Sequence, residues 1–416
     1  MRGSDFVERL LDGVAVEWKA LGEVTLPTSN IRWKDAGQKY LYVDLASVSI
    51  ETKAITAATE IDSSNAPSRA QKIIESDDVI FATTRPTQLR YCLIDDDYAG
   101  AVVSTGYCVL RAKKDEVLPG WILHWLSTEK FKAYVEENQS GAAYPALSDA
   151  KVKGFRLPIP CPSDPKRSLE IQAEIVRILS AFTELTAELN VELTARKKQY
   201  GYYRDRLLAF EEGGAEWKTL GDVALIQRGA SPRPISKFIT DDETGVPWIK
   251  IGDTSPGSKY VNETAQRITQ EGARSSRVLD KGDFILSNSM SFGRPYILGI
   301  TGAIHDGWAS ISKFSDVLSA DFLYHYLSSN AVKNYWTGKI NSGSVSNLNA
   351  EIIRALPVPI PSLAQQKRIA IFLDKFDALT NSEADGLPRE IELRQKQYSY
   401  YRNSLLSFPE VEGVKE

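Results

Sequence analysis

Arginine, lysine, asparagine and serine side chains recur in short loops along this chain. Such side chains hydrogen-bond base edges in the major groove of DNA and hold phosphate oxygens. The candidates in the first half are Arg32, Lys34, Arg69, Arg85 and Arg90. Those in the second half are Arg228, Arg233, Lys250, Arg274, Arg277, Asn288, Arg294 and Ser342. Solvated loops commonly contain these residues, so their recurrence in both halves, rather than any one loop, favours DNA binding.

Catalytic signatures are absent from the sequence. There is no GxxxxGK[ST] phosphate loop and no GxGxxG after a predicted strand. A Pro-Pro-aromatic loop, with which amino-methyltransferases hold a flipped base, is also missing. The three histidines lie apart and are expected to pack in the core or face solvent: His124, His305 and His325. Asp44, Glu51 and Lys53 loosely resemble a nuclease pattern, but so short a pattern often arises by accident. We therefore predict no catalytic residue and no metal site.

Composition is that of an ordinary globular protein. The 416 residues are 43% hydrophobic and 25% charged, with a net charge of −4. This length suggests two or three domains, and the charge neither demands nor excludes a nucleic-acid partner. The three cysteines form no CxxC pair, and the sequence shows no signal peptide or membrane span. A cytoplasmic protein is expected.

One stretch of 15 residues occurs twice. Residues 196–210 read RKKQYGYYRDRLLAF and residues 394–408 read RQKQYSYYRNSLLSF, with ten identical positions. Aromatic and aliphatic residues at heptad-like spacing predict two helices that pack along a seam. We expect helix–helix or subunit contacts from Leu193, Arg196, Tyr200, Tyr203, Leu207, Ile391, Arg394, Tyr398, Tyr401 and Leu405.

These helices alternate with two mixed domains. The phrase EWKALGEV at residues 17–24 returns as EWKTLGDV at 216–223, and each domain leaves through a proline-rich exit, LPIP at 157–160 and LPVP at 356–359. Trp18 and Trp217 are expected to anchor the two cores. Strands are predicted at 39–45, 78–82, 247–251 and 282–287, and helices at 121–135 and 322–327. Two Arg-Pro pairs, beginning at Arg85 and Arg294, follow corresponding strands.

The first long helix is predicted from about residue 168 to 210, which is about 65 Å at 1.5 Å per residue. So long a helix needs a partner of similar length, and the other copy is the obvious one. Gly386 and Pro388 should break or kink the second helix. The predicted fold is α+β, with two mixed α/β domains separated by two long helices. The boundaries are an N-terminal helical segment at 1–16, domains at 17–160 and 213–361, and helical regions at 161–212 and 362–416.

The entry phrases, proline-rich exits and repeated helices together resemble the specificity (S) subunit of type I restriction-modification systems. The motif GLPREIELRQKQY at 386–398 is also similar to that family. The resemblance implies two target-recognition domains, an antiparallel coiled coil and a circular pseudo-twofold repeat. Residues 6–11, which echo the end of the repeated helix, fit that circular plan.

The resemblance also implies partners. Each domain would read one half of a bipartite site in double-stranded DNA, and the helices would set the spacing. Two methyltransferase (M) subunits and two restriction (R) subunits would supply catalysis and bind S-adenosylmethionine, ATP and Mg. No cofactor is expected in this chain, and no membrane. The residues alone leave two alternatives open: a scaffold for protein- or carbohydrate-binding domains, or a standalone nuclease using Asp44, Glu51 and Lys53.

Overall fold

The computed structural model describes residues 15–211, 214–255, 257–288, 293–341, 348–382 and 385–409. The helical segment predicted at 1–16 lies almost wholly outside them. The chain forms two compact units, each containing one mixed domain and parts of the long helices. Unit 1 is Met1–Glu188 with Leu393–Glu416, and unit 2 is Leu189–Glu392. This division cuts through both helices, and the predicted domain boundaries remain predictions.

Unit 1 contains two four-stranded sheets. The first has the order β2 (Thr25–Leu26), β9 (Tyr107–Ala112), β6 (Val79–Ala82) and β7 (Tyr91–Leu93). The second has the order β4 (Thr59–Ile61), β3 (Tyr40–Val43), β8 (Val102–Ser104) and β5 (Ala70–Ile73). In these sheets only β3 and β8 pair in parallel.

Strand β6 lies between two apolar cores because its side chains alternate. Val79 and Phe81 face a core built with three helices, α2 (Pro119–Leu126), α3 (Glu129–Asn138) and α4 (Asp149–Gly154). Ile80 and Ala82 face a second core shared with the other sheet. The predicted helix at 121–135 was wrong as a single element, because the Thr128 hydroxyl accepts from Phe131 N–H and caps a new helix.

Unit 2 repeats this plan with two five-stranded sheets. One has the order β12 (Leu225–Arg228), β21 (Trp308–Ser312), β18 (Phe284–Ser287), β19 (Pro295–Leu298) and β15 (Tyr260–Val261). The other has the order β13 (Ile239–Thr240), β16 (Arg267–Ile268), β14 (Val246–Ile249), β20 (Gly302–Ile304) and β17 (Arg277–Leu279). Four helices complete the domain: α7 (Gln270–Arg274), α8 (Ala320–Leu327), α9 (Asn330–Asn341) and α10 (Ala350–Arg354).

The entry phrase and the exit of each domain pair as a two-stranded antiparallel ribbon. In unit 1 these strands are β1 (Val16–Ala20) and β10 (Arg156–Pro160). In unit 2 they are β11 (Glu216–Thr219) and β22 (Pro357–Ile360), and the short helix α6 (Leu220–Val223) follows β11. The ribbons are therefore equivalent.

The expectation for the two tryptophans holds only in part. Trp18 packs against the core of unit 1, where its ring meets Trp125 at 5.6 Å and the Lys130 ammonium at 3.9 Å. Trp217 is 46% exposed, so its prediction as a core anchor was wrong. The positions that correspond to Trp125 and Lys130 hold Tyr326 and Ala331. The side chains that cover Trp18 are therefore replaced in unit 2.

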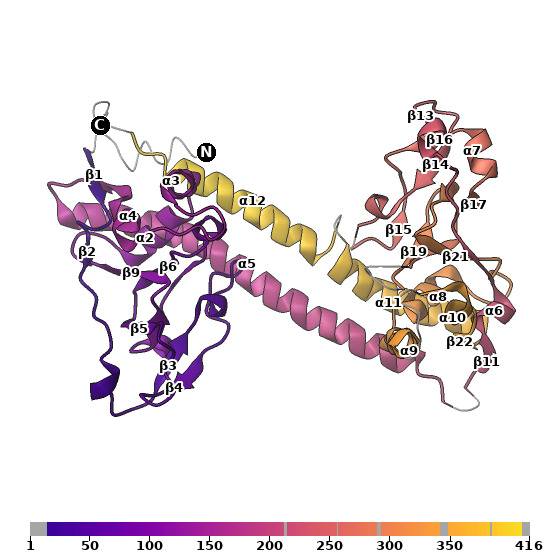
Figure 1. The fold of residues 1–416 in the computed structure, drawn as a ribbon, viewed down its shortest axis with the longest axis horizontal. Helices are drawn as coiled ribbons and strands as arrows, with labels where there is room; N and C mark the ends of the chain where they lie inside the picture. The colour runs from indigo at the N-terminus through magenta and orange to yellow at the C-terminus, as the bar shows by residue number, and fades with distance from the viewer. Residues whose placement is uncertain are drawn as a thin grey trace. The chain divides into compact units, whose positions relative to one another are not determined.

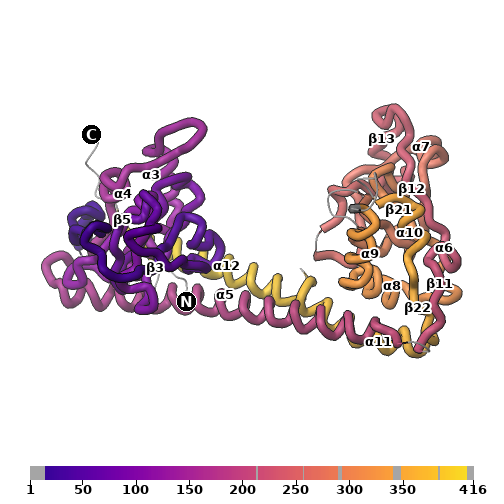
Figure 2. Tube along the Cα trace, turned by 60° about the horizontal axis from the view of Figure 1, so that its bottom comes forward, coloured from indigo at the N-terminus to yellow at the C-terminus, as the bar shows by residue number. Residues whose placement is uncertain are grey.

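Helix α5 (Pro165–Leu208) is continuous, whereas its counterpart is broken into α11 (Leu363–Asn381) and α12 (Leu387–Leu405) (Figure 2). The predicted break is confirmed. A Cβ at Gly386 would come within 2.5 Å of the Ala378 carbonyl oxygen, and Pro388 occupies the first turn of α12. Within unit 1 the first half of α5 runs antiparallel to α12, and within unit 2 the second half runs antiparallel to α11 (Figure 1).

Candidate nucleic-acid interface

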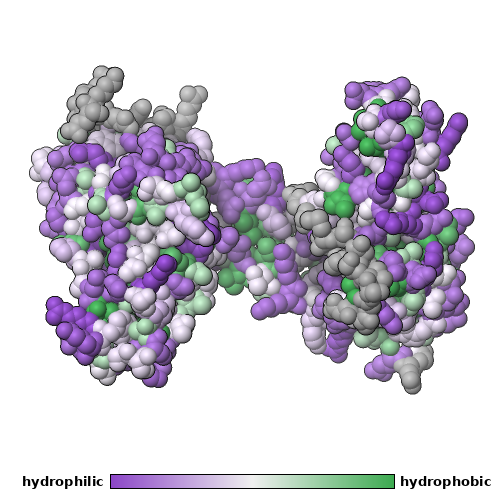
Figure 3. Space-filling model, in the orientation of Figure 1, coloured by the Kyte–Doolittle hydropathy of each residue, from purple (hydrophilic) through white to green (hydrophobic). Residues whose placement is uncertain are grey.

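Three predicted DNA-binding residues of unit 1 gather beside its second sheet. Arg32 and Lys34 flank Trp33, whose indole N–H donates to the Ala70 carbonyl at 2.7 Å. This bond holds their loop against the neighbouring Arg69. All three cationic side chains are exposed. The visible face of unit 1 in Figure 3 is mainly purple and white, in keeping with such polar loops.

Arg85 and Arg90 differ in how far their charges are available. Arg85 is exposed and has φ +50°, in the left-handed region. Arg90 is partly buried and donates to the Val48 carbonyl, so its guanidinium already supports a loop. The guanidinium of Arg85 is therefore more available for contact with a ligand than that of Arg90.

The nuclease-like set in unit 1 is not assembled into a catalytic group by its observed contacts. Lys53 donates to the Leu89 carbonyl and its ammonium lies 4.4 Å from the Tyr91 ring centre. Burial lowers the pKa of Lys53 to about 8. Asp44 accepts from the Tyr42 hydroxyl, and Glu51 accepts from the Ser49 hydroxyl. Each side chain thus has a separate local partner.

In unit 2 a loop after β12 is built around Asp306. The Asp306 carboxylate accepts from the Ser231 hydroxyl at 3.0 Å and from the Arg233 guanidinium at 3.3 Å, while Arg228 donates to its carbonyl. The hydrogen bond from Ser231 is the largest cause that lowers the pKa of Asp306. Gly229 is required here because a Cβ would collide with the His305 carbonyl. Arg233 remains 83% exposed.

A second basic segment of unit 2 lies beside that loop. The Ser276 hydroxyl donates to the Ala230 carbonyl at 2.6 Å, which brings Arg274 and Arg277 next to the loop after β12. Arg274 is exposed, whereas Arg277 has a buried Nε without a hydrogen-bond partner. Lys250 is partly buried and donates to Gln266 at 2.9 Å.

Two further candidates of unit 2 lie among the described residues, Asn288 and Arg294. Asn288 donates its backbone N–H to the Gly307 carbonyl, and its buried Oδ1 has no partner. Arg294 lies over the Tyr296 ring, 5.7 Å from its centre. The strand register makes Arg294 the counterpart of Arg90 rather than of Arg85, because Pro295 faces Leu286 as Tyr91 faces Phe81. Each Arg-Pro pair does follow one of two corresponding strands, β6 and β18, as predicted, but the two pairs do not occupy equivalent positions. Ser342 lies outside the described residues.

Within each unit, a tyrosine of the repeated helix meets a buried histidine of the domain. The Tyr200 hydroxyl lies 3.0 Å from His325 Nδ1, and His325 Nε2 lies 2.8 Å from Asp374. Burial alone would raise the pKa of Asp374, but hydrogen bonds from His325 and Lys259 outweigh it and lower that pKa.

Unit 1 has the same arrangement without the carboxylate. The Tyr398 hydroxyl lies 3.3 Å from His124 Nδ1 and 3.1 Å from the Ser127 hydroxyl. His124 Nε2 lies 3.3 Å from the Ser180 hydroxyl. The expectation that both histidines pack against neighbouring residues is confirmed for His124 and His325, which are both buried.

The third tyrosine of each copy stacks on a phenylalanine of the opposite helix. Tyr203 lies 5.7 Å from Phe376 between ring centres, and Tyr401 lies 5.2 Å from Phe182. These contacts occur within unit 2 and unit 1 respectively. They are the same contact made twice.

The predicted aliphatic seam is displaced by one residue at one position. Leu207 is 36% exposed, whereas Leu208 is 4% exposed and joins the core of unit 2. An α-helix has 3.6 residues per turn, so residues four apart, such as Tyr200, Arg204 and Leu208, lie on the same face. Leu405 and Ile391 are buried, and Leu193 is partly buried. Leu207 is therefore not part of the buried helix seam, and its predicted contact with another subunit stays a prediction.

The two arginines of the repeat begin with the same local contact. Arg196 donates to Gln199 at 2.8 Å, and Arg394 donates to Gln397 at 2.8 Å. Arg196 also pairs with Glu192 at 2.7 Å. Their predicted role in contacts with another subunit stays a prediction.

Sequence reasoning missed a buried glutamine in each unit. Gln172 accepts from Leu118 N–H at 2.9 Å and donates to the Glu116 carbonyl, just before α2. Gln366 accepts from Ser319 N–H at 2.8 Å and donates to the Val317 carbonyl, just before α8. Each glutamine thus fixes the long helix to the start of a domain helix. The identical spacing QxxIxxxLxxF at 172–182 and 366–376 was the available signal.

Comparison with known proteins shows which family has this arrangement of two similar domains joined by long helices. The profile of the type I restriction modification DNA specificity domain matches twice, at residues 32–196 and 213–393. The chain belongs to this specificity-domain family. The specificity subunit of the type I restriction enzyme EcoR124I/EcoR124II of Escherichia coli is 34% identical over the whole of both chains. A putative type I restriction enzyme specificity subunit of Haemophilus influenzae is 30% identical, covering 97% of this chain and 98% of its own.

Solved structures agree with this membership. A chain from a study of complex assembly and conformational transition of the type I R-M system has a TM-score of 0.59 at 26% identity, and the match covers 94% of this chain and 98% of that one. A type I S subunit from M. genitalium has a TM-score of 0.58 at 13% identity, covering 96% and 98% of the two chains, which supports the fold alone. The expected fold class is confirmed for this member of the specificity-domain family.

Metal-binding clusters and membrane-spanning helices are both absent from the part of the chain that the structure describes. There, no three histidine, cysteine or acidic side chains gather in a way that could hold a metal ion. Within the same residues, no helix combines the length and apolar character needed to cross a bilayer. The chemistry this specificity-domain chain presents is hydrogen-bond donation and positive charge on exposed loops.

Proposed function

We propose that this chain is the DNA-recognition subunit of a type I restriction-modification complex. Each mixed domain reads one half of a bipartite site in double-stranded DNA. The observation that carries the proposal is the contrast between the two parts of each unit. In both units a glutamine and a tyrosine of the long helices make equivalent contacts with the domain, the tyrosine with a buried histidine, whereas the exposed basic loops differ between units.

This contrast follows from symmetry. Two identical partner subunits need two equivalent docking surfaces, whereas an asymmetric DNA site needs two different readers. Two methyltransferase subunits would dock on the repeated helices, and two restriction subunits would complete the complex. S-adenosylmethionine, ATP and Mg would be bound by those partners. The chain itself would position DNA without catalysis, in the cytoplasm.

The first test is methylome sequencing of cells that express this chain with its methyltransferase subunit. The expected result is adenine methylation on both strands of one bipartite motif with a fixed gap. The matched control expresses the methyltransferase subunit alone and should give no motif. A contiguous or palindromic motif would contradict two independent readers.

A second test assigns the halves of the motif. Arg233→Ala removes an exposed guanidinium beside Asp306 in unit 2, and Arg32→Ala removes one in unit 1. Loss of a bidentate contact to a base costs about 1–3 kcal/mol of discrimination. Each variant should therefore lose base preference in at most one half of the methylated motif. The half affected by Arg233→Ala should differ from the half affected by Arg32→Ala. Relaxation of both halves by one variant would refute the assignment of one half to each domain.

A further inference from the structure

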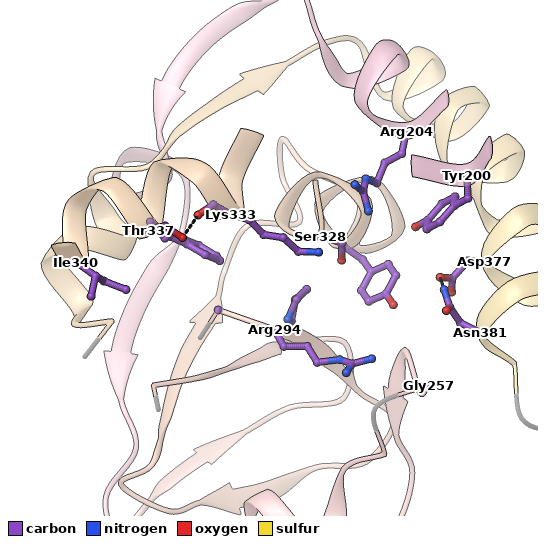
Figure 4. Close-up of a pocket in the computed structure, with 14 residues that line it drawn as sticks. Tyr200, Arg204, Gly257, Arg294, Ser328, Lys333, Thr337, Ile340, Asp377 and Asn381 are labelled. Carbon is purple, nitrogen blue, oxygen red and sulfur yellow. Dashed lines mark hydrogen bonds between the residues drawn. The ribbon is translucent and has the colours of Figure 1, made fainter. Parts of the chain in front are cut away.

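Unit 2 contains a cavity of about 610 Å³ between the end of α5, the helices α8, α9 and α11, and the start of β19. Figure 4 shows three cationic side chains that enter it from different elements. Arg204 comes from α5, Lys333 from α9 and Arg294 from the segment before β19. Among the described residues that line it, Asp377 is the one carboxylate, so positive charge exceeds negative charge in this described lining.

Two of these cations have no anionic partner among the described residues. Arg204 is bound by the Asp205 carboxylate at 3.0 Å, and Asp205 also accepts from the Asn330 side chain. In contrast, no carboxylate in the described part of the chain lies within ion-pair distance of Arg294 or Lys333. Burial is the largest cause that lowers the pKa of Lys333, followed by Arg204; Asp205 acts against this fall, and Arg294 adds to it. An anion between these groups would relieve the repulsion among them.

Asp377 does not neutralise this cluster through an ion pair. Its carboxylate accepts from the Asn381 amide at 2.8 Å, and both side chains come from α11 on the opposite wall in Figure 4. The lining also includes three aromatic side chains, those of Tyr200, Tyr324 and Trp336. The cavity therefore combines three cationic donors with aromatic faces and an amide.

Unit 1 has a different residue at the equivalent place. Its β6–β7 register puts Tyr91 where unit 2 has Pro295. Tyr91 is buried, and its pKa is raised by burial and then by Tyr398, while Arg402 and Ser127 act against this rise. These three neighbours correspond to Tyr200, Arg204 and Ser328 of the cavity. A tyrosine ring thus stands in unit 1 where proline leaves space in unit 2.

We propose that this cavity of unit 2 binds a phosphate group, held by Arg204, Arg294 and Lys333. Two guanidinium groups and one ammonium group match the oxygens of a phosphate, which can accept several charged hydrogen bonds at once. The phosphate belongs either to a free mononucleotide or to the DNA backbone. Only the second source rests on the function proposed above.

The test uses the full chain and three variants. Arg294→Ala and Lys333→Gln remove one charge each, and Pro295→Tyr fills the space while it keeps all three cations. Arg368→Ala is the matched control, because Arg368 is exposed on α11 and does not line the cavity. Circular dichroism verifies that each variant is folded. Isothermal titration calorimetry then measures binding of inorganic phosphate and of AMP.

For a free phosphate ligand, the wild type and Arg368→Ala should bind at least one of the two probes. The three cavity variants should bind about tenfold or more weakly, the loss expected for one charged hydrogen bond. For a backbone phosphate, neither probe binds. Instead, the two charge variants reduce the slope of log affinity for duplex DNA against log salt by about one.

The proposal is overturned if no probe binds and the salt slope is unchanged in Arg294→Ala and Lys333→Gln. It is also overturned if the wild type binds a probe and Pro295→Tyr binds that probe equally well. Neither result would affect the methylated motif expected of the whole complex. Failure of this site and failure of the proposed function are therefore distinguishable.

Discussion

The buried histidine of unit 1 should make the stability of that unit depend on pH. His124 lies between the Tyr398 and Ser180 hydroxyls, with Arg402 nearby. Burial and then Arg402 lower its pKa from 6.5 to about 4. Because the unfolded chain binds the proton more tightly, this stability is present above pH 6.5 and is lost as the pH falls toward 4.

The size of the effect follows from the two pKa values. By proton linkage, the lowered pKa of His124 destabilises the folded unit by about 2 kcal/mol at pH 5 and by about 0.2 kcal/mol at pH 7. Hydrogen exchange of the amides in α2, corrected for intrinsic rates at each pH, measures the free energy of opening. The wild type should lose about 1.8 kcal/mol more than His124→Gln between pH 7 and pH 5.

Helix α8 of unit 2 provides an internal control, since its amides should show no pH-dependent difference between the two proteins. Carboxylates that titrate over the same range contribute equally to both proteins and cancel. If the difference between wild type and His124→Gln in α2 is the same at pH 5 and pH 7, the reasoning is refuted.

Three further predictions concern the contacts between the long helices and the domains. In each case the change in the free energy of unfolding is measured by urea denaturation, followed by hydrogen exchange in the affected unit. Tyr200→Phe should destabilise unit 2 by about 1–3 kcal/mol, because it leaves a buried imidazole nitrogen unpaired, and Tyr398→Phe should cost unit 1 less because its contacts are longer. An equal cost in both units would contradict this ranking. Gln366→Ala should cost about 1–3 kcal/mol and increase exchange at the start of α8, since it removes the three hydrogen bonds of a buried side chain. Unchanged protection there would count against the glutamine's role. Leu208→Ala should cost about 2–5 kcal/mol, whereas Leu207→Ala should stay within about 1 kcal/mol, and the reverse order would restore the original seam.

The sequence allowed accurate prediction of features that depend on local periodicity. The long helix was expected at 168–210 and spans Pro165–Leu208, and the break near Gly386 and Pro388 is present. Both follow from spacing and from two residues with strong conformational preferences. The equivalence of the two domains followed from repeated entry and exit phrases.

Features that depend on tertiary register could not be predicted in the same way. The availability of the Arg90 side chain depends on the Val48 carbonyl, 42 residues away. The counterpart of Arg294 became clear only from strand pairing. The exposure of Trp217 depends on the residues that α8 and α9 hold at the positions of Trp125 and Lys130. Periodicity also left the choice between Leu207 and Leu208 open, since both lie near one helix face.

The paired ribbons have a consequence for how such chains change over time. Val16 faces Pro160 in unit 1, and Glu216 faces Ile360 in unit 2, so each domain begins and ends on adjacent strands. Adjacent strands are about 4.8 Å apart. A foreign domain whose ends meet this spacing can replace the resident one while the helices stay as they are. Recombination between related genes at the codons of these strands would therefore exchange one reader at a time and create new pairs of readers from old ones.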